Sequence, residues 1–482
     1  MSPDAASDEP TPRRTRREPR DRGALIALGG AIALSAALIL FETRDSALFN
    51  DEVTVYQQLA ASFDAETVLA PRNGHLLAVA TLLYELVFSV FGLEYWVLRV
   101  IDVIGLAVLA VVLFAYLRRR LDPWLALAPV VVVLFLGASW ETLLWPFSVA
   151  TFVFALAAGI GALLMVERRT RRGDLAACAL LVLGLACHSI TLPFVIGIAV
   201  MLLWRRRHRG RAWVFLVPLF LYAVWWIWAL KFESTSALDA VNVWLIPAYA
   251  AEALAAVLAS VTGLGATIAG GGLNPTIQIA SGWGQILALV AVVALAVRLS
   301  RRAVSIPLVA TLAILTTYWA MAALSLGPER QPDESRYILP GAVMVFLVAA
   351  NALSGVRVPP AARVAVLAVT VFAVATGVRQ LHDGALFLQD YSLRAQATAT
   401  GIEEAEATVP PGYEPRNDSS LTGQVPPQLP LKAVDYLAAK REFGSLAFDR
   451  RELAEQPAHI QQVAEDVRIA AISAGAGVEP PD

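Results

Sequence analysis

Charged residues are scarce in this chain, and long apolar runs replace them. Only 16% of the 482 residues are charged, whereas 57% are hydrophobic, a larger apolar share than soluble domains have. The low charge therefore excludes an ordinary soluble protein. Lipid offers the backbone no hydrogen-bond partners, so apolar runs of roughly 20 residues are read as membrane-spanning helices. The sequence predicts an all-α polytopic protein of the cell membrane and excludes a transmembrane barrel.

Cysteine is also rare. The two cysteines, Cys178 and Cys187, lie nine residues apart in one predicted helix. That spacing places them on roughly opposite helix faces. We therefore expect no disulfide bond.

The first apolar run covers residues 24–41 and follows a polar stretch rich in arginine and proline. A basic stretch before an apolar run also occurs in signal peptides, but this run is too long and no small-residue cleavage site precedes Glu42. We therefore expect an uncleaved first helix, with residues 1–23 disordered on the cytoplasmic side.

Arginine clusters follow several apolar runs and set the expected orientation. Cytoplasmic loops are enriched in Lys and Arg, so each interval between clusters should hold an even number of crossings. This condition predicts about 11 membrane-spanning helices, with the N-terminus cytoplasmic and the C-terminus extracytoplasmic. The clusters are Arg118–Arg120, Arg168–Arg172, Arg205–Arg211, Arg298–Arg302 and Arg357–Arg363. The expected spans are residues 24–41, 96–117, 124–139, 147–166, 175–187, 190–204, 213–230, 283–297, 304–326, 338–353 and 364–378.

The apolar run at residues 75–91 is expected not to cross the membrane. One more crossing before the first arginine cluster would break the parity, and Glu85 lies in the middle of the run. We expect a helix along the outer interface. A second helix, amphipathic or re-entrant, is expected around residues 248–264.

The chain divides into three expected parts. Residues 1–23 form the N-terminal tail, and residues 24–379 form the transmembrane domain. Residues 380–482 form a small extracytoplasmic C-terminal segment with a proline-rich middle at 409–430. Helical patterns are expected there near residues 433–441 and 457–471.

Asp51 and Glu52 form an acid pair about ten residues beyond the first expected span. A carboxylate in such a place acts as a general base or holds a divalent cation such as Mg or Mn, because both tasks need an anionic oxygen facing a partly dry cleft. Acid pairs are also common in ordinary solvated loops. Spacing alone favours the solvated loop.

Arg330 and Arg336 flank a short outer turn and are candidates for binding a phosphate. The alternative is that they are interfacial arginines, next to Tyr337 as a boundary aromatic. Arginine is otherwise scarce on the outer side, which favours the phosphate site. His75 is a phosphate donor or a capping surface histidine.

Further polar and aromatic side chains are expected in short outer turns. They are candidate contacts for a sugar or an acceptor, although tryptophans often belong to the aromatic belt of a membrane protein. His188, beside Ser189, is expected more often as a polar contact between helices than as a ligand. The candidates are Trp140, Glu141, Trp145 and His188.

The order of these motifs resembles the GT-C superfamily of membrane glycosyltransferases, in particular its protein O-mannosyltransferase and lipid A aminoarabinose transferase branch. The resemblance covers roughly residues 24–379. In place of the His-Pro-Pro that is usual in the mannosyltransferase branch, His75 is followed by leucines, which leaves the acceptor open. The matching segments are Phe49–Glu52, Asn73–Leu77, Val90–Arg99, Arg118–Arg120 and Ser335–Tyr337.

The resemblance implies transfer of a hexose or pentose from a polyprenyl-phosphate carrier to an acceptor hydroxyl on the outer face. Asp51 would be the base, and Glu52 would assist it or bind a metal. The departing phosphate would be stabilised where negative charge develops, by Arg336, Arg330, Tyr337 and His75. The expected partners are the lipid-linked sugar, the bilayer and a cell-envelope glycan, glycolipid or protein acceptor, with no nucleic acid.

A transporter or a lipid or polysaccharide flippase is the main alternative, and a scaffold or polymer-exporting partner is a third. Transport predicts charges buried at mid-membrane and inverted repeats. Asp102 is the clearest charge within an expected span, and the sequence has no obvious repeat. The clustering of polar groups on one face favours the transferase.

Overall fold

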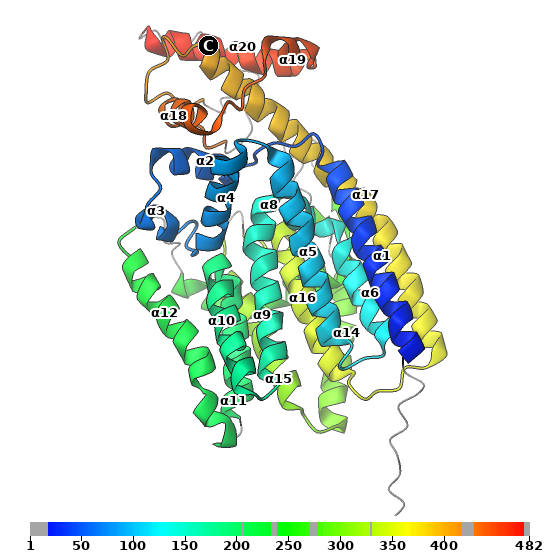
Figure 1. Ribbon diagram of the computed structural model, residues 1–482. Helices are drawn as coiled ribbons and strands as arrows, with labels where there is room; N and C mark the ends of the chain where they lie inside the picture. Colours follow the sequence, from blue (N-terminus) through cyan, green and yellow to red (C-terminus); the bar gives the residue numbers. More distant parts are fainter. Residues whose placement is uncertain are drawn as a thin grey trace, which may run out of the picture.

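The computed structural model describes residues 18–204, 206–232, 239–268, 278–280, 282–327, 330–415 and 429–476. Figure 1 shows a bundle of long helices with a smaller group of helices at one end. Most of the tail expected at residues 1–23 lies outside the described residues. Its last six residues belong to the first helix, α1 (Glu18–Glu42).

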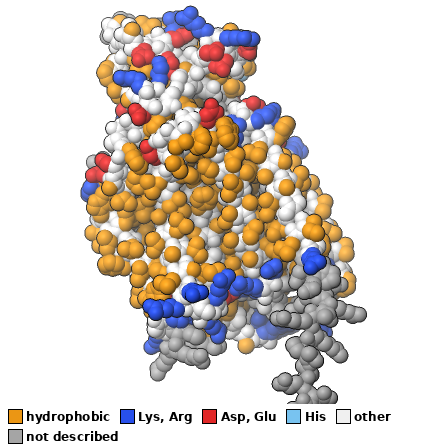
Figure 2. Space-filling view, viewed as in Figure 1, with side chains coloured by type: hydrophobic (Ala, Val, Ile, Leu, Met, Phe, Trp, Pro, Cys, Tyr) orange, Lys and Arg blue, Asp and Glu red, His pale blue; other side chains and the backbone are white. Residues whose placement is uncertain are grey.

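Nine helices of the described residues are long and apolar enough to cross a membrane, or ten if one bent pair is a single span. On the face seen in Figure 2, a broad belt of hydrophobic side chains covers the bundle, with Lys and Arg gathered at its lower edge. The described residues therefore form a helical protein of the multi-pass membrane type, apart from one short antiparallel strand pair, β1 (Ala266–Ile268) and β2 (Gln278–Ala280). The nine segments are Arg22–Glu42, Tyr95–Leu117, Pro146–Val166, Arg209–Ala229, Val241–Val261, Gly282–Arg301, Ile306–Leu324, Ser335–Ala352 and Pro360–Glu404.

The two ends of the bundle differ, and we name them by their contents. The basic end carries the arginine-rich loops that follow α5 (Tyr95–Leu117), α9 (Phe154–Val166) and α14 (Gly282–Arg301). The α2 end carries α2 (Asp51–Ala61), α3 (Ala65–Leu69) and α4 (Ala78–Phe91). Other long helices of the bundle are α10 (Arg171–Cys187), α11 (Leu192–Leu203), α12 (Trp213–Ala229), α15 (Ile306–Leu324) and α16 (Ser335–Ala352).

The span expected at residues 124–139 is broken. α6 (Pro123–Leu134) stops early, and η1 (Gly137–Ser139) with α7 (Trp140–Leu144) continues at an angle of 46°. Here the chain lies so close to α17 (Pro360–Glu404) that a Cβ on Gly377 would come 1.9 Å from a backbone oxygen. The break between α6 and η1 allows this close contact with the backbone of α17.

The next span also departs from a regular helix. It starts as α8 (Pro146–Ser148) and passes through a π-helical turn, η2 (Val149–Val153), before α9 begins. A turn of this kind is often found at functional sites. It packs against both α5 and α4.

Helix α13 (Ile246–Val261) lies where an amphipathic or re-entrant helix is expected. Its two flanks are held at similar depths: Asp239 N donates to Leu324 O at 3.0 Å, and Gln380 Nε2 donates to Gly265 O at 3.1 Å. Both contacts lie about 30 Å along α15 and α17 from the starts of those helices at the basic end. Both flanks of α13 therefore lie toward the α2 end.

Helix α17 runs without a break through the boundary expected at residue 380 and reaches Glu404, beyond the bundle. α18 (Ala433–Phe443), α19 (Arg450–Glu455) and α20 (Ala458–Gly475) follow. α20 packs on α17, and α18 packs on α2. Gln57 in α2 joins the two parts, because it donates to Pro430 O at 2.5 Å and accepts from Lys432 N at 3.0 Å.

Candidate functional site

The acid pair opens helix α2, and the two carboxyl groups have different surroundings. Asp51 is the first helical residue and is half-buried, whereas Glu52 is fully buried. The preceding Asn50 has a positive φ of 43°, an uncommon conformation outside glycine. Because a helix N-terminus carries partial positive charge, it stabilises a carboxylate in the first turn.

Glu52 is held inside the protein by three donors. Its carboxyl group accepts hydrogen bonds from the Tyr84 hydroxyl, from Tyr95 Oη at 3.0 Å and from Phe49 N at 2.8 Å. Burial raises the pKa of Glu52 to about 7, although these hydrogen bonds act in the opposite direction. Glu52 therefore fixes the start of α2 against α4 and α5.

This geometry does not fit a metal held by Asp51 and Glu52. Both oxygens of Glu52 are already bound to protein donors. Within the residues that the structure describes, no group of three or more His, Cys, Asp or Glu side chains is placed to hold a metal ion. The expectation of a divalent cation at this pair is revised for that reason.

A tight turn brings a further arginine to Asp51. Arg72 and His75 are paired by backbone hydrogen bonds of 3.0 and 2.8 Å, and Asn73 and Gly74 between them have φ values of 49° and 79°. Asn-Gly with two positive φ values is the signature of a type I′ turn. Burial lowers the pKa of Arg72 to about 10, and the negative charge of Asp51 opposes that effect.

The same turn places His75 against the loop between α10 and α11. His75 Nδ1 lies 2.8 Å from Ser189 Oγ, and its ring centroid is 4.1 Å from that of His188. Burial, followed by the charge of Arg330, lowers the pKa of His75 to about 4. His75 is therefore a neutral imidazole at neutral pH.

His188 makes one local hydrogen bond and one aromatic contact. Its Nδ1 accepts a hydrogen bond from Ile190 N at 3.1 Å, and its ring stacks on Phe152 at 4.4 Å. The bond to Ile190 caps a short 3-10 turn, η3 (Ser189–Thr191), before α11. The His188 side chain also lines the cavity described below.

Arg336 and Glu141 form an ion pair, with Arg336 Nε 3.5 Å from Glu141 Oε1. Two serine contacts fix the segments that carry them: Ser139 Oγ donates to Ser335 O at 2.8 Å, and Glu141 N donates to Ser335 Oγ at 3.2 Å. The charge of Asp51 also acts on Arg336. The structure thus brings Asp51, Arg72 and Arg336 into one neighbourhood.

The two tryptophans expected as sugar contacts are core residues. Trp140 is 6% exposed and packs edge-on against Phe387, and Trp145 is 4% exposed and packs edge-on against Phe49. Neither indole has an open face on which a sugar could stack. We therefore revise both assignments, because burial between helices explains these residues.

An apolar cavity of about 440 Å³ lies beside these polar residues. Its walls come from α11, α12 and α15, and its polar rim contains all but one of the expected phosphate contacts. Arg336 is absent from the lining, but its neighbour Tyr337 is present. The apolar walls include Leu192, Leu219, Ile227, Met321 and Ala322, and the rim includes His75, His188, Ser189, Arg330 and Tyr337.

Sequence reasoning missed several residues of this region. Arg72, Tyr84 and Tyr95 were not expected to contribute, because their roles depend on contacts between elements that spacing does not reveal. Arg72 alone carried a local signal, since it directly precedes the Asn73–Gly74 pair.

Comparisons with known proteins do not identify a family for this chain. Neither a scan against protein-family models nor searches of curated proteins and of solved structures found a match to this chain.

Proposed function

We propose that this protein is a glycosyltransferase that moves a sugar from a polyprenyl-phosphate donor to an acceptor hydroxyl on the outer face of the cytoplasmic membrane. The carrying observation is the cavity of about 440 Å³, which has apolar walls and a cationic rim. A prenyl chain suits walls built from membrane helices, and a phosphate suits a rim that carries Arg330. Arg336 directly precedes the rim residue Tyr337, and the charge of Asp51 acts on Arg336.

The proposed topology has eleven crossings, with the N-terminus cytoplasmic and the C-terminus outside. Helices α4 and α13 lie along the outer surface, which is supported by the 14-residue length of α4 and by the flanks of α13. The crossings are α1, α5, α6, α9, α10, α11, α12, α14, α15, α16 and α17. Cysteine labelling at Gly92 and Glu94 from the outer side tests this topology, and labelling only from the cytoplasm contradicts it.

In the proposed reaction, the Asp51 carboxylate takes the proton of the acceptor hydroxyl. The acceptor oxygen then attacks the anomeric carbon, the bond from that carbon to the phosphate oxygen breaks, and the electron pair leaves with the phosphate. Arg336 and Arg330 stabilise the charge that develops there. His75 and Tyr337 assist as neutral hydrogen-bonding groups.

Glu52 has a positioning role in this proposal rather than a direct one. Its carboxyl group is buried and tied to Tyr84 and Tyr95. It anchors the first turn of α2 and thereby fixes Asp51 relative to the arginines.

A transporter or flippase is the second candidate, because of Asp102 in α5. Its side chain is 1% exposed, and neither carboxyl oxygen has a hydrogen-bond partner among the described residues. An ionisable group buried within a span is typical of transport pathways. Proton-dependent lipid movement in vesicles that is lost in Asp102→Asn, without any sugar transfer, would favour this candidate.

The test of the proposed function is a transfer assay. Purified protein is incubated with a panel of radiolabelled hexosyl and pentosyl polyprenyl phosphates and with cell-envelope acceptors, and the products are identified by mass spectrometry. We expect a labelled product with at least one donor. A folded protein that transfers no sugar from any donor of the panel contradicts the proposal.

A further inference from the structure

A second cavity lies at the basic end, far from the residues proposed to act on the sugar donor. It has a volume of about 430 Å³ and lies between α9, α11 and the start of α15. Its lining combines an apolar wall with arginine side chains. Such a lining is complementary to an anionic amphiphile, which has an apolar tail and a negatively charged headgroup. The apolar wall is formed by Val166, Met201, Leu202, Val304 and Ile306.

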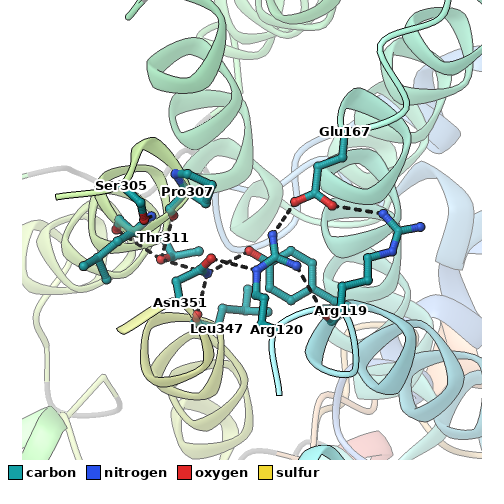
Figure 3. Close-up of polar contacts among 10 residues, drawn as sticks. Arg119, Arg120, Glu167, Ser305, Pro307, Thr311, Leu347 and Asn351 are labelled. Atoms are coloured by element: carbon teal, nitrogen blue, oxygen red, sulfur yellow. Dashed lines mark hydrogen bonds and ion pairs between the residues drawn. The ribbon is translucent and has the colours of Figure 1, made fainter. Parts of the chain in front are cut away.

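The acid that lines this cavity is already neutralised by the protein. Figure 3 shows Arg119 and Arg120 converging on Glu167, with Ser305 and Pro307 on a neighbouring helix. Arg119 Nη1 donates to Glu167 at 3.0 Å, and the Arg120 guanidinium also binds its carboxylate. Glu167 therefore presents little unpaired negative charge to a ligand.

The two arginines that line the cavity differ in their partners. Arg211 makes two hydrogen bonds to Asp174, of 2.8 and 2.5 Å, and one to Val166 O at 2.9 Å. The Arg169 side chain is exposed and has no hydrogen bond or ion pair to any of the described residues. Its backbone has a positive φ of 53°. Arg169 is thus a cation at the cavity with no partner in the described part of the chain.

The start of α15 adds positive potential to the same cavity. Ser305 is its N-cap, and Ser305 Oγ accepts from Leu308 N at 3.4 Å. Ser305, Ile306 and Pro307 all line the cavity. The N-terminal end of this 19-residue helix carries partial positive charge, which favours a phosphate.

We propose that this cavity binds the phosphate headgroup of an anionic phospholipid, with an acyl chain against its apolar wall. The charge arrangement would suit free phosphate as well, but the walls favour a lipid. Val304 is 49% exposed and Trp204 is 59% exposed, and both line the cavity at the basic end of the bundle. Tryptophan at that level is typical of a membrane interface. The inference does not depend on the proposed glycosyltransferase function.

The test measures lipid binding to the purified full-length protein by native mass spectrometry. Dioleoyl phosphatidylglycerol is titrated against dioleoyl phosphatidylcholine, which has the same chains and no net charge. We expect tighter binding of the anionic lipid. Arg169→Gln should weaken that binding about five-fold, the effect of one arginine near an anionic surface. Arg168→Gln is the matched control, because it removes the same charge from the same loop but outside the cavity lining.

A second variant keeps the proposal testable if Arg169→Gln alters the loop. Ser305→Asp retains an effective helix N-cap and adds a negative charge at the cavity, so it should also weaken binding of phosphatidylglycerol. Equal losses in Arg168→Gln and Arg169→Gln, or unchanged binding in Arg169→Gln and Ser305→Asp, would overturn the site. Displacement of the lipid by inorganic phosphate at similar concentration would identify a free-phosphate site and overturn the lipid assignment.

Discussion

The two ends of the bundle bury polar groups in different ways. At the basic end, Arg120 Nε donates to Asn351 Oδ1 at 2.7 Å, and Asn351 Nδ2 donates to Tyr116 Oη at 3.0 Å (Figure 3). Toward the α2 end, Arg72 Nη2 and both carboxyl oxygens of Asp102 are buried and have no hydrogen-bond partner among the described residues.

This difference distinguishes the structural network at the basic end from the candidate functional site at the α2 end. A fully satisfied buried network makes a set of helices rigid, whereas each unsatisfied buried group calls for a ligand, a water or a function. The network around Arg120 joins α5, α9 and α16. The charge of Asp51 acts on the unsatisfied Arg72, and the charge of Glu52 acts on the unsatisfied Asp102, so both groups lie near the acid pair that opens α2.

The largest expected effect is that of Asp51→Asn on sugar transfer. The change removes the proposed base but keeps the size of the side chain, so turnover should fall about a hundred- to ten-thousand-fold while donor binding is retained. Rate and donor affinity are measured separately in the transfer assay. Asp45→Asn is the control, because Asp45 lies in the loop before α2 and forms an ion pair with the exposed Arg44. Near-normal turnover of Asp51→Asn would remove Asp51 as the base.

Glu167→Gln tests the network at the basic end. It leaves Arg119 and Arg120 without their shared carboxylate, and the loss of charged hydrogen bonds should cost about 2 kcal/mol of unfolding free energy. Thermal unfolding in detergent measures the change, and sugar transfer by the folded fraction should stay near normal. Glu94→Gln, at an exposed glutamate, is the control. If Glu167→Gln lost sugar transfer without losing stability, the basic end would contribute to activity and not only to stability.

Glu52→Gln tests the buried carboxyl group through pH. The folded pKa of Glu52 is about 7, above the ordinary value of 4.5, so its contribution to stability is fully present below pH 4.5 and is lost as pH rises through 7. The pKa of His75 is lowered to about 4, so the contribution of His75 to stability rises as pH increases from 4 to 6.5. The difference in unfolding temperature between wild type and Glu52→Gln isolates the first effect. Between pH 4.5 and 7, the unfolding temperature of the wild type should fall relative to that of Glu52→Gln. A difference between the two unfolding temperatures that does not change with pH would contradict the raised pKa of Glu52.

Gly74→Ala should have the smallest effect of the set. A side chain at φ 79° strains the turn that carries Arg72 and His75, and the expected loss is about 1 kcal/mol. Thermal unfolding is compared with Gly412→Ala, where a Cβ meets no atom within 4 Å. Equal stability of the two variants would mean that the turn is not held in this conformation.

Hydropathy predicted the helices that lie in the belt better than those outside it. The first expected span, 24–41, lies within α1, and the apolar run at 75–91 becomes α4 after the turn at Asn73–Gly74 delays its start to Ala78. The extension of α17 to Glu404 was missed because a helix outside lipid needs only one apolar face. That face includes Leu381, Ala385 and Leu388.

The candidate site was predictable only as far as the end of the bundle at which its residues lie. Arginine parity assigned Asp51, His75 and Arg336 to one side, and the structure brings them to one end of the bundle. Burial was not readable from spacing: Glu52 was expected in a solvated loop or a partly dry cleft, and Trp140 in the aromatic belt or against a sugar, although both are core residues. Contacts between helices decide such orientations, and a single sequence does not display them.

The most direct test of the account is a cryo-EM structure of the Asp51→Asn variant bound to a polyprenyl-phosphate sugar. The account predicts density for the prenyl chain in the cavity between α11, α12 and α15, with the phosphate at Arg330 and Arg336 and the sugar toward residue 51. A donor bound elsewhere, or with its phosphate away from both arginines, would contradict it.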